Sequence, residues 1–133
     1  MRMKLSVSKT LLAASMALGL MGAQAQQGKL SGDAVKIGVL TDFSGVYSDY
    51  GGQGALVAAK MAVQDFGGKM FGKPIEVVNA DHQNKPDIAK TIALRWFDRD
   101  GVDISVENLN SSVALAVQAL GKEKNKKIGR AHV

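Results

Sequence analysis

Few residues of this 133-residue chain have the chemistry that catalysis requires. Its histidines are His82 and His132, and the absence of cysteine excludes disulfides, thiolate metal sites and a cysteine nucleophile. We expect His82 to be a solvated loop residue, since it can pair with Asp81 but has no nucleophile placed to complete a triad. The motifs of zinc proteases and of phosphate-binding loops are also missing. The sequence therefore predicts no enzyme, no cofactor and no metal ion.

The glycine-rich segment Gly51–Gly54 invites comparison with dinucleotide-binding loops. Its glycines do not follow the spacing G-x-G-x-x-G, and they stand about ten residues beyond the nearest predicted strand, where such a loop follows its strand directly. We therefore expect these glycines to let the chain turn close to the start of a helix.

Polar residues that could bind a small molecule lie in three segments, each after a predicted strand: 42–50, 81–86 and 108–112. In open parallel sheets, ligands bind outside the carboxyl ends of the strands. The third segment leads into a helix, whose first N–H groups and the hydroxyl of Ser111 can hold a carboxylate without a cationic side chain. Ser111 is also predicted to cap that helix.

The other candidates for ligand contact are Tyr50, Asn110 and Ser112. Tyr50 can either line the ligand site or pack locally within its own loop. Asn110 and Ser112 flank Ser111 and bring further hydrogen-bonding groups to the same place.

Apolar runs and helical periodicities predict the elements that carry these segments. Strands are expected over residues 35–41, 74–80 and 102–106, although Ser105 and Glu107 are polar for a central strand. Helices with one apolar face are expected over residues 52–66, 86–100 and 111–120, and they end at Gly67, Gly101 and Gly121. The order β-α-β-α-β-α predicts an α/β fold, the start of a doubly wound parallel sheet, which is incomplete because such sheets usually have five or six strands.

The formal net charge of +5 does not predict binding to nucleic acid. The excess of basic residues lies at the two ends of the chain, and residues 26–127 are nearly neutral. The chain also has few aromatic side chains on which bases could stack. No basic binding face is therefore expected.

The first 25 residues have the features of a cleavable secretory signal peptide. Arg2 and Lys4 precede the apolar segment Leu11–Met21, and Ala23-Gln24-Ala25 is a small-x-small cleavage site. The apolar segment is too short to span a bilayer, which requires about 20 residues. We therefore expect export, a mature chain that starts at Gln26, and a periplasmic location.

The sequence over residues 34–127 resembles the N-terminal part of type I periplasmic substrate-binding proteins. These are the leucine-binding-protein-like components of the branched-chain amino-acid ABC transporters. The matching segments are Val-Lys-Ile-Gly-Val-Leu-Thr-Asp-Phe-Ser-Gly at 35–45, Gly-Ala-Leu-Val-Ala-Ala-Lys-Met-Ala-Val at 54–63, Gly-Lys-Pro-Ile at 72–75, the 81–86 loop, and Asn-Ser-Ser at 110–112. Each segment is short, and their combination in this order carries the resemblance.

The resemblance implies a protein of two lobes joined by a hinge, which traps an amino acid or a related small carboxylate between them. Ser111 and the backbone around it would hold the ligand carboxylate, and Tyr50 would line the pocket. Asn110 stands where some relatives have a cysteine bridged back to the second loop, and this sequence has neither partner. The implied partners are an inner-membrane permease and its ATPase subunits. The alternative is an extracytoplasmic ligand-sensing domain of the same fold.

Residues 26–127 are thus expected to form the first part of the N-terminal ligand-binding lobe. The hexapeptide at 128–133, Ile-Gly-Arg-Ala-His-Val, resembles the conceptual translation of a common sequencing adapter. We expect a truncated reading frame with a non-native tail over 128–133. A fourth strand should follow the third helix, and residues 123–127 resemble the approach to it.

Overall fold

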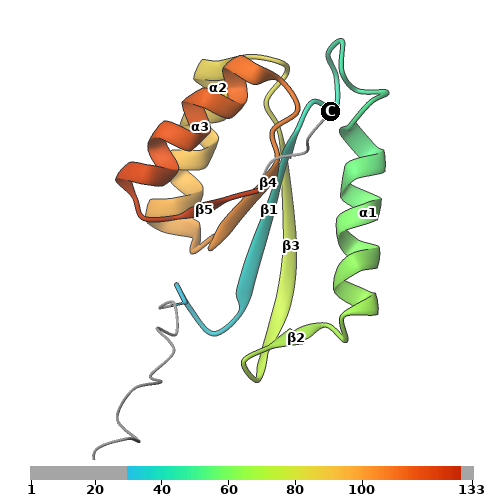
Figure 1. The fold of residues 1–133 in the computed structure, drawn as a ribbon, viewed down its shortest axis with the longest axis vertical. Helices are drawn as coiled ribbons and strands as arrows, with labels where there is room; N and C mark the ends of the chain where they lie inside the picture. Colours follow the sequence, from blue (N-terminus) through green and yellow to red (C-terminus); the bar gives the residue numbers. More distant parts are fainter. Residues whose placement is uncertain (1–29, 130–133) are drawn as a thin grey trace, which may run out of the picture.

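The computed structural model describes residues 30–129, which form a five-stranded sheet with helices on both faces (Figure 1). The elements in chain order are β1 (Val35–Thr41), α1 (Gly52–Asp65), β2 (Lys69–Met70), β3 (Lys73–Asp81), α2 (Pro86–Arg95), a π-helical segment (Trp96–Asp100), β4 (Ile104–Glu107), α3 (Ser111–Glu123) and β5 (Lys127–Ile128). The predicted signal peptide and residues 130–133 of the predicted tail lie outside the described residues.

The strand order is β2-β3-β1-β4-β5, with β1 at the centre. Strand β1 pairs in parallel with β3 and β4, so that Val39 lies beside Asn79 on one side and Val106 on the other. Strand β5 continues the parallel sheet, and the short β2 pairs antiparallel with β3 at the opposite edge. The predicted parallel α/β sheet is confirmed. Ile128, assigned to the predicted tail, lies in β5.

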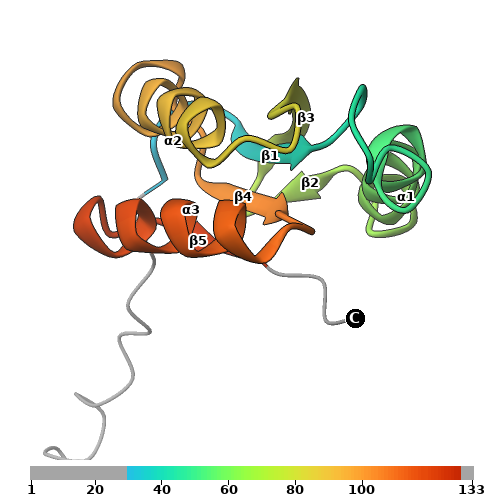
Figure 2. The same cartoon turned by 90° about the horizontal axis from the view of Figure 1, so that it is seen from above.

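Helix α1 covers one face of the sheet, whereas α2 and α3 pack together on the other face (Figure 2). The core lies on the face with α2 and α3, and its buried residues are Leu40, Ala89, Ala93, Trp96, Phe97, Val102, Val113, Val117 and Leu120. Trp96 lies directly over Gly38 of β1, where a Cβ atom would come within 2.4 Å of the indole ring. The missing side chain of Gly38 therefore makes room for the largest residue of the core.

The face with α1 is less well covered. Val39 and Leu56 are buried there, but Val57 and Met61 are exposed on the outer side of α1. Phe66, which the periodicity placed on the apolar face of this helix, is also exposed, because it lies beyond the last helical residue.

One predicted helix end needs correction, and another helix changes its geometry before its predicted end. The helix that starts at Pro86 changes to π-helical geometry at Trp96 and then ends as predicted at Gly101, which has φ of 70°. Helix α3 does not end at Gly121 but continues to Glu123, and Asn125, with φ of 52°, follows its end. Gly121 is needed for packing instead, because a Cβ atom there would lie 2.6 Å from the Ile128 side chain. Within residues 30–129, no helix has the length and apolar character to cross a membrane.

Candidate functional site

The three polar segments predicted to bind a ligand meet at the carboxyl edge of the sheet. Strands β1 and β3 end side by side at Thr41 and Asp81, and β4 ends at Glu107 beside Leu40. The backbone N–H of His82 donates to the Thr41 carbonyl at 2.9 Å, and that of Asn108 donates to the Leu40 carbonyl at 3.3 Å. These bonds extend the sheet pairing into the loops and place the loops next to one another.

The first loop, between β1 and α1, is organised by a buried carboxylate. Asp42 has no exposed surface, and its two oxygens accept hydrogen bonds from the N–H groups of Gly45 at 2.6 Å and Tyr47 at 3.0 Å. Tyr47 packs edge to face against Tyr50, with ring centroids 6.4 Å apart. Tyr50 is 82% exposed, so its contact with Tyr47 of the same loop leaves most of its ring accessible.

The second loop contacts the first through Asp81, the last residue of β3. Its carboxylate accepts hydrogen bonds from the N–H of Phe43 at 3.1 Å, the hydroxyl of Ser44 at 2.6 Å and the N–H of Gln83 at 2.7 Å. Burial favours the neutral carboxyl, but these three bonds favour the carboxylate more strongly and lower the pKa of Asp81. The ionised side chain therefore ties the two loops together at neutral pH.

The cap of α3 was predicted at the wrong residue. Asn110, not Ser111, caps the helix, and its Oδ1 accepts hydrogen bonds from the N–H groups of Ser112 at 2.8 Å and Val113 at 3.2 Å. Both residue types can cap, but only Asn110 has the extended backbone that places its side chain beneath the helix start. Ser111 is the first helical residue, and it is exposed, as is Ser112.

This cap changes what the start of α3 offers to a ligand. Because the Asn110 side chain takes the N–H groups of Ser112 and Val113, a ligand carboxylate would rely on Ser111. The Ser112 hydroxyl donates to Asn110 Oδ1 at 2.5 Å and so presents its lone pairs outward. The structure thus brings Asn110, Ser111 and Ser112 together and gives them different tasks.

The second and third loops are linked by two amides. The side-chain N–H₂ of Asn110 donates to the Oδ1 of Asn84, which lies in the loop between β3 and α2. Asn110 is the position at which the resemblance places, in some relatives, a cysteine bridged back to the second loop, and here its side chain bonds to that loop through an amide. Asn84 was not among the predicted site residues, since nothing in its local sequence indicates a partner 26 residues away.

Glu107 is a second residue that the site prediction missed. Its backbone has φ of 82°, which is unusual for a residue other than glycine, and its side chain turns toward the start of α1. A Cβ atom on Gly51 would lie 2.7 Å from Glu107 Oε1 and 2.9 Å from the Thr41 hydroxyl oxygen, so a larger residue there would displace these side chains. Burial raises the pKa of Glu107, against hydrogen bonds from the Thr41 hydroxyl and the N–H groups of Leu109 and Asn108. The feature of the sequence that could have indicated this residue is an acidic side chain at the end of a central strand.

His82 is not the solvated loop residue that was expected. It is fully buried, because the first loop folds over the turn that follows β3. Burial lowers the pKa of His82, although Asp42 and Asp81 nearby act in the opposite direction. Among the described residues, no group of three or more histidine, aspartate or glutamate side chains is placed to hold a metal ion.

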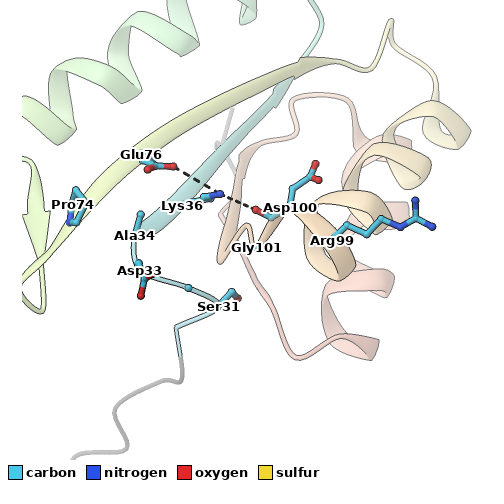
Figure 3. A pocket seen from close by; sticks show the side chains of 10 residues that line it. Ser31, Asp33, Ala34, Lys36, Pro74, Glu76, Arg99, Asp100 and Gly101 are labelled. Carbon is cyan, nitrogen blue, oxygen red and sulfur yellow. Dashed lines mark hydrogen bonds and ion pairs between the residues drawn. The ribbon is translucent and has the colours of Figure 1, made fainter.

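A cleft of about 470 Å³ lies at the opposite, amino end of the sheet, and it is not the predicted site (Figure 3). Its cationic groups are engaged or turned away. Lys36 Nζ donates to the Asp100 carbonyl at 3.1 Å and lies 3.9 Å from Glu76 Oε2, and the Arg99 side chain points out of the cleft. The carboxyl edge therefore remains the candidate site.

The family model and the similar solved structures indicate the same protein family. The family model described as "Periplasmic binding protein" matches residues 34–127. A periplasmic binding protein from Burkholderia mallei is 54% identical to this chain, with a TM-score of 0.69, over 74% of this chain and 27% of that one. No curated protein matches the chain significantly.

Two other solved structures are similar. A branched-chain amino acid ABC transporter periplasmic ligand-binding protein from Burkholderia xenovorans is 49% identical, with a TM-score of 0.69, over 71% of this chain and 25% of that one. An ABC transporter solute-binding protein from R. palustris, solved in complex with benzoate, is 26% identical, with a TM-score of 0.66, over 73% and 27%. The chain thus spans about a quarter of the length of the structures it matches.

Proposed function

The chain belongs to the periplasmic binding proteins of the branched-chain amino-acid ABC transporter type, and from this premise we propose that it is the first part of the ligand-binding lobe of a solute-binding component for import. The proposed ligand is a branched-chain amino acid or a related small carboxylate. The observation that carries the proposal is the start of α3, where Ser111 and Ser112 are exposed at the carboxyl edge beside the loop of Tyr50.

The proposed contacts follow from the geometry of this edge. Ser111 donates its hydroxyl hydrogen to a ligand carboxylate, and the positive end of the α3 dipole favours the negative charge. Tyr50 presents an exposed ring to the apolar part of the ligand. Ser112, whose hydroxyl hydrogen is donated to Asn110, can only accept a hydrogen bond from a donor group of the ligand. Asn110 holds the helix start in place and acts through Ser112 and Val113.

The proposal includes the cellular location of the protein and its partners in transport. A cleavable signal peptide over residues 1–25 would deliver the protein to the periplasm, where it would pass its ligand to an inner-membrane permease with ATPase subunits. Such a component binds and releases its ligand without catalysis, and it has no need for a cofactor. The Burkholderia xenovorans and R. palustris relatives, both named as ABC transporter proteins, favour import over the alternative of ligand sensing.

A graft tests the ligand and the site together. Residues 34–127 would replace the matching segment of the Burkholderia mallei protein, which supplies the rest of both lobes. Calorimetry should show that at least one of leucine, isoleucine, valine and benzoate binds to the graft. Ser111→Ala in the graft should weaken that binding about tenfold or more, as expected for a hydrogen bond to a charged group. Thr91→Ala, which removes an exposed hydroxyl on α2, serves as the matched control.

The two failures of this experiment are distinct. Absence of binding to any of the four compounds by a folded graft contradicts the proposed ligand class. Binding that Ser111→Ala leaves unchanged contradicts the placement of the site at α3.

A further inference from the structure

His82 is a buried titratable group to which the proposed ligand site gives no task. Its Nδ1 accepts a hydrogen bond from the backbone N–H of Asn84 at 3.0 Å. An acceptor at Nδ1 requires the neutral ring with its proton on Nε2. That Nε2 is buried and has no hydrogen-bond partner among the described residues. The ring is therefore held by one bond that depends on its protonation state.

The bond from Asn84 to His82 belongs to a strained turn. Gln83 and Asn84 both have left-handed backbone, with φ of 52° and 57°, and Lys85 N–H closes the turn onto the His82 carbonyl at 2.8 Å. Neither residue is glycine, so this conformation costs free energy. Two side chains hold it: Asp81 accepts from the N–H of Gln83, and His82 accepts from the N–H of Asn84.

The turn at residues 82–85 also holds the start of α3. The Asn84 side chain accepts the amide hydrogen of Asn110, and Asn110 Oδ1 caps the helix through Ser112 and Val113. A continuous series of hydrogen bonds thus runs from the imidazole of His82 through Asn84 and Asn110 to the helix start.

Protonation would break this series at its first bond. The imidazolium carries a hydrogen on Nδ1, which would face the Asn84 N–H, and two donors repel one another. The charged groups around His82 are Asp42, at the end of β1, and Asp81, at the end of β3. Glu107, at the end of β4, is the next acidic side chain and interacts with Asp42.

We propose that His82 is a positioning residue that holds the start of α3 only in its neutral form, so that acidification releases the turn at residues 82–85 and loosens the Asn110 cap. A change in ligand affinity with pH would rest on the function proposed above. The hydrogen-bond series itself does not, and it can be tested without a ligand.

Nuclear magnetic resonance of the full 133-residue chain tests the bond directly. At pH 7.5 the ¹⁵N shifts of His82 should report the tautomer with hydrogen on Nε2. His82 should titrate below the ordinary histidine value of about 6.5, because burial favours its neutral ring. The Asn84 and Asn110 resonances should move with the His82 titration.

Two variants separate this role from plain packing. His82→Asn keeps an acceptor near the Nδ1 position but cannot titrate there, whereas His82→Phe fills the space without an acceptor. The melting temperature of the parent chain should fall between pH 7.5 and pH 5 by roughly 4–8 °C more than that of His82→Asn, the shift expected for one hydrogen bond in a domain of this size. His82→Phe should melt lower at both pH values, and His132→Asn should behave as the parent.

Three results would overturn the proposal. The first is a His82 that titrates at the ordinary histidine value of about 6.5, or a chain without dispersed resonances at pH 7.5, since either shows that the ring is not buried. The second is an Asn84 amide that does not follow the titration. The third is a His82→Asn variant with the same pH dependence as the parent. None of these results bears on whether the grafted site binds a carboxylate.

Discussion

Asn84 and Asn110 are joined side chain to side chain across the carboxyl edge, although 26 residues separate them in the sequence. The bond connects the turn after β3 to the cap of α3.

Asn110→Ala should destabilise the chain by about 0.5–2 kcal/mol through loss of the helix cap. Asn110→Ser should restore most of the cap but not the bond to Asn84. Urea unfolding of Asn84→Ala, Asn110→Ala and the double variant would give the coupling between the two amides. We expect a coupling of about 0.5 kcal/mol or more, and additive effects would show that the bond contributes nothing.

A disulfide should be able to replace the hydrogen bond between Asn84 and Asn110. Asn84→Cys combined with Asn110→Cys is expected to oxidise to a disulfide and to raise the free energy of unfolding by roughly 3–4 kcal/mol, because the loop it closes is of moderate length. Thiol titration and melting curves with and without reductant measure this. Equal melting temperatures in the two conditions would argue against the contact.

Gly38→Ala should cost about 1–3 kcal/mol, because the added Cβ atom would overlap the Trp96 ring in a filled core. Gly54→Ala is the matched control, since nothing lies within 4 Å of a Cβ atom there. In the first turn of α1 it should stabilise the chain by up to about 0.5 kcal/mol, because alanine loses less backbone entropy on folding than glycine. Chemical denaturation distinguishes the two, and effects of the same sign would contradict the packing of Trp96 on β1.

Glu107→Gln should stabilise the chain at neutral pH. Because the folded state raises the pKa of Glu107, it holds the proton more tightly than the unfolded chain does. Stability therefore falls as the pH rises from the ordinary glutamate value through the raised one, and glutamine removes that loss. Melting curves from pH 4 to pH 7 check this, with the exposed Glu76→Gln as control. An unchanged pH profile in Glu107→Gln would contradict the burial of this carboxyl.

The chain alone should show no measurable affinity for leucine or benzoate by calorimetry. It spans about a quarter of the length of its structural relatives, and closure of a second lobe supplies desolvation and the opposing contacts. Micromolar binding by this chain would contradict the expectation and would place the whole site on the described residues.

Much of the fold could be predicted from local patterns. The apolar runs at β1 and β3 and the one-sided faces of α2 and α3 predicted the alternating order, because burial imposes a period on the side chains of each element. The two-residue strands β2 and β5 have no period to detect. They exist because β3 and β4 offer unpaired edges beside them.

The location of the candidate site at the carboxyl edge of the sheet could be predicted, but the roles of its individual residues could not. The sequence by itself determined that polar loops follow each parallel strand and that serines open a helix at the same edge, since these depend on residue type and order. Only the tertiary structure decided that Asn110 caps α3, because Asn84 approaches it from another loop. It also decided that His82 is buried, because the loop after β1 closes over it, and that Gly121 is a packing residue, because Ile128 lies against it. Each of these depends on a neighbour that is distant in the sequence, and no local pattern carries that information.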